Sequence, residues 1–318
     1  MTQKQKAISI ENYYHSAGLS GDPFKIDTGA VNLLYAKIKR EVVLWATLPS
    51  PAHVLVEGPR EDRDILFKLC FEEVEKIKHP VEIKLDEEKT ILSLALKEYE
   101  GKGDVFFVTG VEEDAQRFVR DLRHKRDFLY SFKFPVIIGV DSSTVRLIAA
   151  QAINYYDIIA RIINIHASLD KEDMKTWIIS AIEDVATSED YEVANFITEE
   201  AIDLLSNIKS PVRIQQIVRG ALAYKVEKGY KIPTPINSAD IEHVIKGEKE
   251  MHVSKLDESS KIVFNYVKGH PGVSSSDEEI MDELGLSLPR IKRILDSLVA
   301  QGFIRSEEEN GKRVYYPF

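Results

Sequence analysis

The first half of the chain alternates short apolar runs with longer amphipathic stretches. Five runs are almost wholly apolar and five or six residues long, which is typical of strands buried on both faces. These strands are predicted at His53–Glu57, Val81–Leu85, Asp104–Thr109, Pro135–Val140 and Ile162–His166. Helices are predicted near 61–77, 87–99, 111–130 and 142–153. Strands that alternate with helices favour a parallel sheet covered by helices on both faces.

The pattern changes after residue 168, because helical periodicity continues without further strands. Helices are predicted at 170–186, 198–207, 211–228 and 238–246, followed by a polar connector at 247–255. The last stretch predicts helices at 256–267, 277–284 and 287–301, then a hairpin that turns at Asn310-Gly311. Three helices followed by a hairpin indicate a winged helix-turn-helix.

These patterns predict an α/β plus α fold in three domains. Residues 1–168 form an α/β core with a five-stranded parallel sheet, preceded by an N-terminal segment that begins with a flexible arm at 1–9. Residues 169–250 form a helical lid domain, and residues 251–318 form the winged helix-turn-helix.

Composition narrows the class of protein. The chain has 318 residues, 44% of them hydrophobic and 30% charged, as in globular proteins. It shows no hydrophobic signal core at its start and no apolar run of membrane-spanning length, so we expect a cytoplasmic protein without a membrane partner. The single cysteine, Cys70, excludes an intrachain disulfide framework. Because the net charge is −10, any contact with nucleic acid must come from a local basic patch.

The stretch from Ala52 to Cys70 has the outline of a phosphate-binding loop, namely a strand, a glycine turn and a helix. When it is laid over G-x-x-x-x-G-K-[ST], Gly58 matches the first glycine, and Arg63 falls on the second. Asp64 then stands at the lysine and Ile65 at the serine or threonine. A carboxylate would face the phosphates and an aliphatic chain would face the metal, so the pattern predicts lost nucleotide chemistry.

The whole order resembles an AAA+ ATPase with a C-terminal winged helix. The segment from Tyr13 to Phe24 resembles the motif that precedes the P-loop domain in secretion- and transposition-helper AAA ATPases. Residues 207–214 resemble the lid segment that carries the sensor-2 arginine, and Arg213 falls on that arginine with Val212 inserted before it. AAA+ origin-recognition initiators share this domain order.

The resemblance implies a degenerate nucleotide site. In the family the third strand ends in Asp-Glu, which holds magnesium, whereas here it ends in Thr109-Gly110. The degenerate site is therefore assigned to Gly58, Asp64, Ile65, Thr109 and Arg213, with no bound cofactor and no metal. We expect a protein that is not an enzyme, because the ATPase motifs are degenerate.

The expected function is binding of double-stranded DNA, a partner protein or both, in replication, recombination or a related genome process. The partner would be an AAA+ or replication-type protein. The winged helix would bind DNA through cations at the start of its third helix and in its hairpin, namely Arg290, Lys292, Arg293, Lys312 and Arg313. Two alternatives stay open: an assembly subunit without DNA binding, similar to the P-loop-less clamp-loader subunits, and a nucleotide-binding switch without hydrolysis.

One further basic segment follows the third strand. Its cations lie mainly three residues apart on one predicted helix, and they are Arg117, Arg120, Arg123, Lys125 and Arg126. They could form a surface for an anion, a nucleic acid or a partner. Alternatively, they form a solvated face paired with Glu112, Glu113, Asp114 and Asp121.

Overall fold

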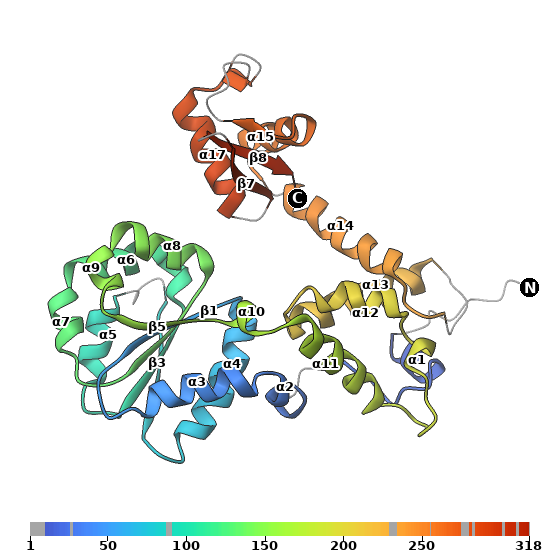
Figure 1. Cartoon of the computed structure of the whole chain (residues 1–318), viewed down its shortest axis with the longest axis horizontal. Helices are drawn as coiled ribbons and strands as arrows, with labels where there is room; N and C mark the ends of the chain where they lie inside the picture. The colour runs from blue at the N-terminus through green and yellow to red at the C-terminus, as the bar shows by residue number, and fades with distance from the viewer. Residues whose placement is uncertain are drawn as a thin grey trace, which may run out of the picture. The chain divides into compact units, whose positions relative to one another are not determined.

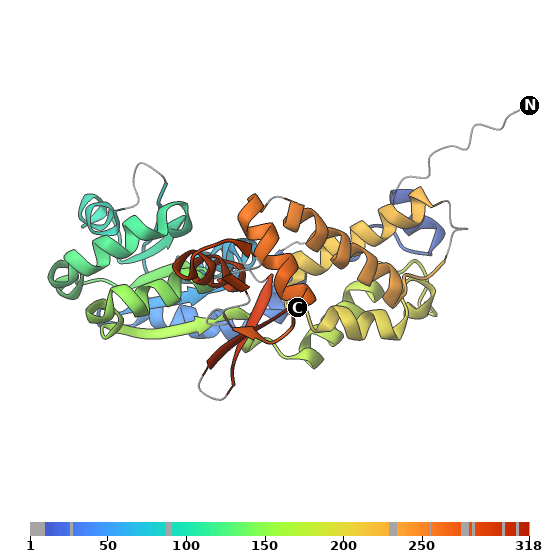
Figure 2. The same cartoon turned by 90° about the horizontal axis from the view of Figure 1, so that it is seen from above.

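The chain folds into two compact units, Met1–Ile241 and Glu242–Phe318 (Figures 1 and 2). The computed structural model describes residues 10–25, 28–86, 91–228, 234–254, 256–274, 280–281, 284–300, 303–309 and 312–317. The arm predicted at residues 1–9 lies outside the described residues.

A five-stranded parallel sheet lies in the first unit, as the sequence predicts (Figure 1). Its strands are β1 (His53–Glu57), β2 (Pro80–Lys84), β3 (Val105–Thr109), β4 (Val136–Val140) and β5 (Ile159–Asn164). Their order across the sheet is β2-β3-β4-β1-β5, and every neighbouring pair is parallel. Glu57 pairs with Val140 and with Asn164, so β1, β4 and β5 end at one common edge.

The fifth strand begins and ends earlier than predicted. Ile159 pairs with His53, and the strand ends at Asn164 rather than His166. The Asn164 side chain accepts a hydrogen bond from the N–H of Ala167 at 2.8 Å, which caps a new helix, α10 (Ile165–Ser168). The apolar run is therefore divided between a strand and a capped helical turn.

Helices cover both faces of this sheet (Figure 1). On one face, α3 (Ala36–Thr47) and α4 (Arg60–Val74) pack against β4. The other face is covered by helices from the β2–β3, β3–β4 and β4–β5 connections, namely α5 (Leu92–Tyr99), η1 (Val111–Asp114), α6 (Ala115–His124), α7 (Arg126–Ser131), α8 (Ser142–Gln151) and α9 (Ile153–Tyr156). Their core includes Phe106, Phe118, Ile138, Ile148 and Tyr155, all fully buried.

The rest of the first unit is helical. Its elements are α1 (Ile10–Ser16), α2 (Thr28–Leu34), α11 (Lys171–Glu183), η2 (Val193–Asn195), α12 (Glu199–Ser206) and α13 (Pro211–Glu227), with the start of α14 (Ser238–Ser254). The N-terminal segment packs against these helices: Phe24 is fully buried with its ring 5.8 Å from that of Trp177, and the N–H of Ser20 donates to the Val185 carbonyl at 2.7 Å. The helix predicted at 238–246 continues to Ser254, so the predicted connector at 247–255 is helical over most of its length.

The second unit contains a short antiparallel sheet and the helices that pack on it. Its elements are α15 (Glu258–Gly269), β6 (Val273–Ser274), α17 (Leu288–Ala300), β7 (Ile304–Glu309) and β8 (Lys312–Pro317). The strand order is β6-β8-β7, and β7 and β8 form the predicted hairpin. Of the helix predicted at 277–284, the structure describes residues 280, 281 and 284, which are helical, while the predicted turn residues Asn310 and Gly311 lie outside the described residues.

Within the parts of the chain that the structure describes, no helix has the length and apolar character that crossing a bilayer requires.

Candidate functional site

The connection between β1 and α4 is short and tightly packed. Strand β1 ends at Glu57 and α4 begins at Arg60, so Gly58 and Pro59 alone join them. The N–H of Gly58 donates to the carbonyl of Val140 at 3.1 Å, and a Cβ added to Gly58 would lie 3.0 Å from Cδ1 of Ile165. Asp64 and Ile65, which stand at the lysine and hydroxyl positions of the P-loop pattern, therefore lie in the second turn of α4 and not in an open loop.

Acidic side chains occupy the first turn of α4. Asp62 is fully buried, accepts a hydrogen bond from the Tyr35 hydroxyl at 3.0 Å, and lies 3.5 Å from Nε2 of His166. Burial, together with the charge of Asp62, raises the pKa of Tyr35, so that its phenol stays a hydrogen-bond donor. Glu61 and Asp62 complement the positive end of the helix dipole. A phosphate placed there, as at many helix N-termini, would meet negative charge.

Ion pairs between two arginines and two glutamates join α4 to the turn after β3, and Nε of Arg60 also lies 3.9 Å from Oε1 of Glu112. Arg63 pairs with Glu112 at 2.5 Å, and Arg60 pairs with Glu113 at 2.7 Å. The Arg63 side chain is only 4% exposed, and its Cδ would lie 3.5 Å from a Cβ added to Gly139 on β4. These pairs link α4 to η1, which directly follows β3, and so hold the start of the helix near the carboxyl end of the sheet.

The sequence pattern does not predict this cluster. The P-loop alignment places Arg63 at the second glycine, and Glu112 and Glu113 are predicted as partners of the basic segment on the next helix. The available signal was a pair of arginines just after β1 and a pair of glutamates just after β3. Parallel strands bring such turns to the same edge of a sheet.

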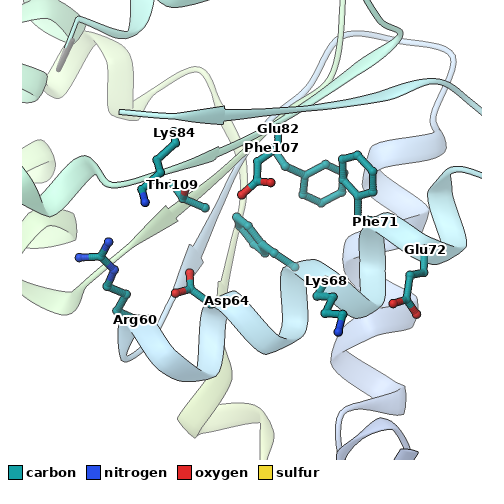
Figure 3. Close-up of a pocket in the computed structure, with 10 residues that line it drawn as sticks. Arg60, Asp64, Lys68, Phe71, Glu72, Glu82, Lys84, Phe107 and Thr109 are labelled. Atoms are coloured by element: carbon teal, nitrogen blue, oxygen red, sulfur yellow. The ribbon is translucent and has the colours of Figure 1, made fainter. Parts of the chain in front are cut away.

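Asp64 and Thr109 line a pocket of about 490 Å³ between α4, β2 and β3 (Figure 3). Its apolar part is formed by Phe67, Phe71 and Phe107, with the rings of Phe67 and Phe107 5.4 Å apart at nearly right angles. Charged side chains of both signs surround these rings, namely Arg60, Asp64, Lys68, Glu72, Glu82 and Lys84. Burial raises the pKa of Asp64, although Arg60 and Arg63 oppose the shift. The pocket combines an aromatic floor with a mixed-charge rim.

The structure brings together part of the predicted nucleotide site. Asp64 and Thr109 share the pocket, whereas Gly58, Ile65 and Arg213 do not line it. Arg213 lies in the first turn of α13, where its N–H donates to Oγ of Ser210 at 3.2 Å. The assignment of these five residues to a degenerate nucleotide site stays a prediction.

The five cations predicted to bind DNA lie on α17 and at the start of β8. Arg290 donates to Oγ of Ser259 at 2.8 Å, and Arg313 pairs with Asp296 at 2.8 Å. The other three, Lys292, Arg293 and Lys312, are exposed, and within the described residues they form no ion pair. Among the described residues, three of the five therefore carry a positive charge that no ion pair neutralises.

No protein-family model matches the chain, and no curated protein sequence matches it. The structure is similar to that of the Aeropyrum pernix ORC1 protein solved in complex with DNA, with a TM-score of 0.54 and 10% identity over 89% of this chain and 88% of that chain. Weaker similarities are to the Aeropyrum pernix ORC2 protein (TM-score 0.47, 10% identity, 91% of this chain and 88% of that chain) and to the Thermotoga maritima RuvB Holliday junction branch migration motor (TM-score 0.45, 13% identity, 89% and 92%). The likeness to ORC1 shows that this chain has an AAA+ fold.

Proposed function

We propose that this chain is a non-catalytic AAA+-fold protein that binds DNA, a partner protein or both through a winged helix in its C-terminal unit. It would act in DNA replication, recombination or a related genome process. The observation that carries the non-catalytic part is the β1–α4 connection, in which Gly58 and Pro59 alone join the strand to a helix tied down by ion pairs.

The residues at this junction support the absence of ATP hydrolysis. Phosphoryl transfer depends on a cation that holds the phosphates and on groups that hold magnesium. Asp64 and Ile65 stand where the lysine and hydroxyl would be, and β3 ends in Thr109. Arg63 and Glu112, which have suitable charges, already neutralise each other. A nucleotide would have to displace this buried pair, so we expect no bound nucleotide cofactor.

The second unit supports the binding part of the proposal. The order α15, the helical residues 280, 281 and 284, α17 and the β7–β8 hairpin fits a winged helix with α17 as its recognition helix. Arg290, Lys292 and Arg293 lie in the first turns of that helix, where recognition helices meet phosphates and bases. The ORC1 protein with the same fold was solved in complex with DNA.

Fluorescence anisotropy with a labelled 30-base-pair duplex tests DNA binding by this surface. We expect the Arg290→Gln/Lys292→Gln/Arg293→Gln variant to raise Kd by at least about tenfold near 100 mM salt, and to reduce the slope of log K against log salt by about 2 to 3. The matched control replaces Lys97, Lys102 and Lys171, which are exposed on the first unit, with Gln. The same Kd and salt slope in wild type and the α17 variant would remove this surface from the proposal.

A protein-assembly role is the second candidate, and the contacts of two predicted DNA-binding residues favour it. Arg290 is held by Ser259, and Arg313 by Asp296, so their charges are partly committed within the unit. Glu307 on β7 is exposed and lies opposite Val314, next to Arg313 along the hairpin, where it adds negative charge. Absence of any DNA affinity at 50 mM salt, with the protein folded, would favour this candidate.

A further inference from the structure

The outer surface of α6 and the start of α7 carries a cluster of cations. Arg120, Arg123, Lys125 and Arg126 are all exposed, and they are called here the α6–α7 basic face. Within residues 91–228, all of which the structure describes, none of the four side chains forms an ion pair or hydrogen bond. This accumulation of unpaired positive charge stands out in a chain with a net charge of −10.

The α6–α7 basic face points to solvent because the apolar side of α6 is buried in the core. Phe118, Val119 and Leu122 on the opposite side of α6 are buried in the core beneath the sheet. Helix α6 packs among α5, α8 and α9 on this face of the sheet (Figure 1). Its apolar residues are buried and its cations are exposed, so the cations lie on the solvent side of the helix. Arg120 and Arg123 are one helical turn apart on the exposed side, and Lys125 and Arg126 continue the face where α7 begins.

Four of the five acids near these cations are held by other groups, and the fifth, Asp127, is exposed. Glu112 and Glu113 pair with Arg63 and Arg60. Asp114 caps α6 by accepting from the N–H of Arg117 at 2.9 Å.

Asp121 is buried and accepts hydrogen bonds from both the N–H and Oγ of Ser93, at 2.8 and 2.7 Å. The solvated, internally paired face considered in the sequence analysis is therefore not formed by the four residues of the basic face. Asp127, on α7, is the exposed acid next to them.

We propose that the α6–α7 basic face binds the phosphate backbone of a nucleic acid, as a site separate from the C-terminal unit. Three of its four cations are arginines, whose planar guanidinium groups bind phosphate oxygens in pairs. Tyr130 lies one turn beyond Arg126 on α7, and its side chain is 71% exposed. An exposed ring beside a row of cations can stack an unpaired base, as in proteins that bind single strands. This combination favours nucleic acid over an acidic protein surface.

The test uses the full chain and its Arg120→Gln/Arg123→Gln/Lys125→Gln/Arg126→Gln variant, titrated against a labelled 30-nucleotide single strand and a 30-base-pair duplex. We expect Kd to rise by at least about tenfold near 100 mM salt for the nucleic acid bound, with a salt slope lower by about 2 to 4. The control replaces Lys25, Lys97, Lys102 and Lys171 with Gln, which removes the same charge elsewhere. The milder Arg120→Gln/Arg123→Gln variant replaces the fourfold one if circular dichroism shows loss of fold.

Tyr130→Ala separates the two forms of nucleic acid. If a base stacks on this ring, the variant weakens single-strand binding by about fivefold or more and leaves duplex binding unchanged. An equal Kd for wild type and the basic-face variant on both nucleic acids overturns the proposal. It is also overturned if the variant loses affinity for poly-glutamate alone, which assigns the face to an acidic protein. The result is independent of the α17 variant, so failure here leaves the proposed function intact.

Discussion

Arg63 links the first turn of α4 to the turn after β3 through a single ion pair. Its side chain is buried, with Cδ packed near Gly139 on β4, and its guanidinium has Glu112 as its ion-pair partner. Arg60 and Glu113 form a neighbouring pair with side chains 44% and 36% exposed. Two pairs of the same chemistry, one buried and one solvated, give a direct comparison of what burial contributes.

Arg63→Met should lower the free energy of unfolding by about 3 kcal/mol, because the partly buried Glu112 would lose its close partner and keep only the Nε of Arg60, 3.9 Å away. Arg60→Met, which removes the solvated partner, should cost at most about 1 kcal/mol. Urea denaturation of the two variants measures both values. Equal losses would show that Arg63 does not hold the junction as the structure indicates.

His53 predicts an acid sensitivity of the first unit. Its ring is buried and lies 2.9 Å from the Tyr155 hydroxyl through Nδ1, and burial lowers its pKa to about 4. Below pH 6.5 the unfolded chain binds a proton that the folded chain does not, so stability falls as pH drops toward 4.

The expected contribution of His53 to this loss is about 2 kcal/mol between pH 7 and pH 5. His53→Gln should remove that part of the pH dependence, which urea denaturation at the two pH values would show. If the wild type and the variant lose the same stability on acidification, His53 is not the group responsible.

At the scale of elements, the apolar runs predicted four of the five strands to within one residue at each end. The fifth was displaced because the Asn164 side chain caps α10, a local competition that hydrophobic periodicity does not register. Polar residues at 247–255 predicted a connector, yet α14 continues to Ser254, since a polar, charged sequence can also form a solvated helix. The left-handed turn at Gly110, directly after β3, is the feature of this scale that the sequence pattern does not predict.

Gly110 should tolerate no side chain at that turn. It has φ +78°, and an added Cβ would overlap the carbonyl oxygen of Leu85, whose N–H bonds to Thr109. Gly110→Ala should lower the free energy of unfolding by about 3 kcal/mol or more. The alanine would hold a strained positive φ, and the backbone at Leu85 would also have to move away from the new Cβ.

Gly101→Ala is the matched control, with φ +80° and nothing within 4 Å of the added Cβ. Gly101→Ala should lower the free energy of unfolding by only about 1 kcal/mol, because only the positive φ is unfavourable. Thermal unfolding of both variants would distinguish steric overlap from the cost of φ alone, and equal losses would argue against close packing of the turn on β2.

At the scale of the whole molecule, the fold was predictable from the order of elements, but the candidate site was only partly so. Asp64 and Thr109 were selected by motif position and do meet in one pocket. The pairing of Arg63 with Glu112 depends on two turns 49 residues apart that meet only after the sheet forms. Likewise, the α6–α7 basic face keeps its charge because Asp121 binds Ser93 and the two glutamates pair with Arg60 and Arg63. These contacts join residues far apart in the sequence.

Thermal unfolding with and without ATP and magnesium tests the central claim, that this AAA+ fold holds its junction without nucleotide. A ligand present at a hundred times its Kd would add about 2.7 kcal/mol and raise Tm by several degrees. We predict no change in Tm at about 5 mM ATP and about 10 mM magnesium, which would be a large excess over the Kd of a typical nucleotide site. A rise of several degrees, saturating with ATP and lost on removal of magnesium, would contradict the account.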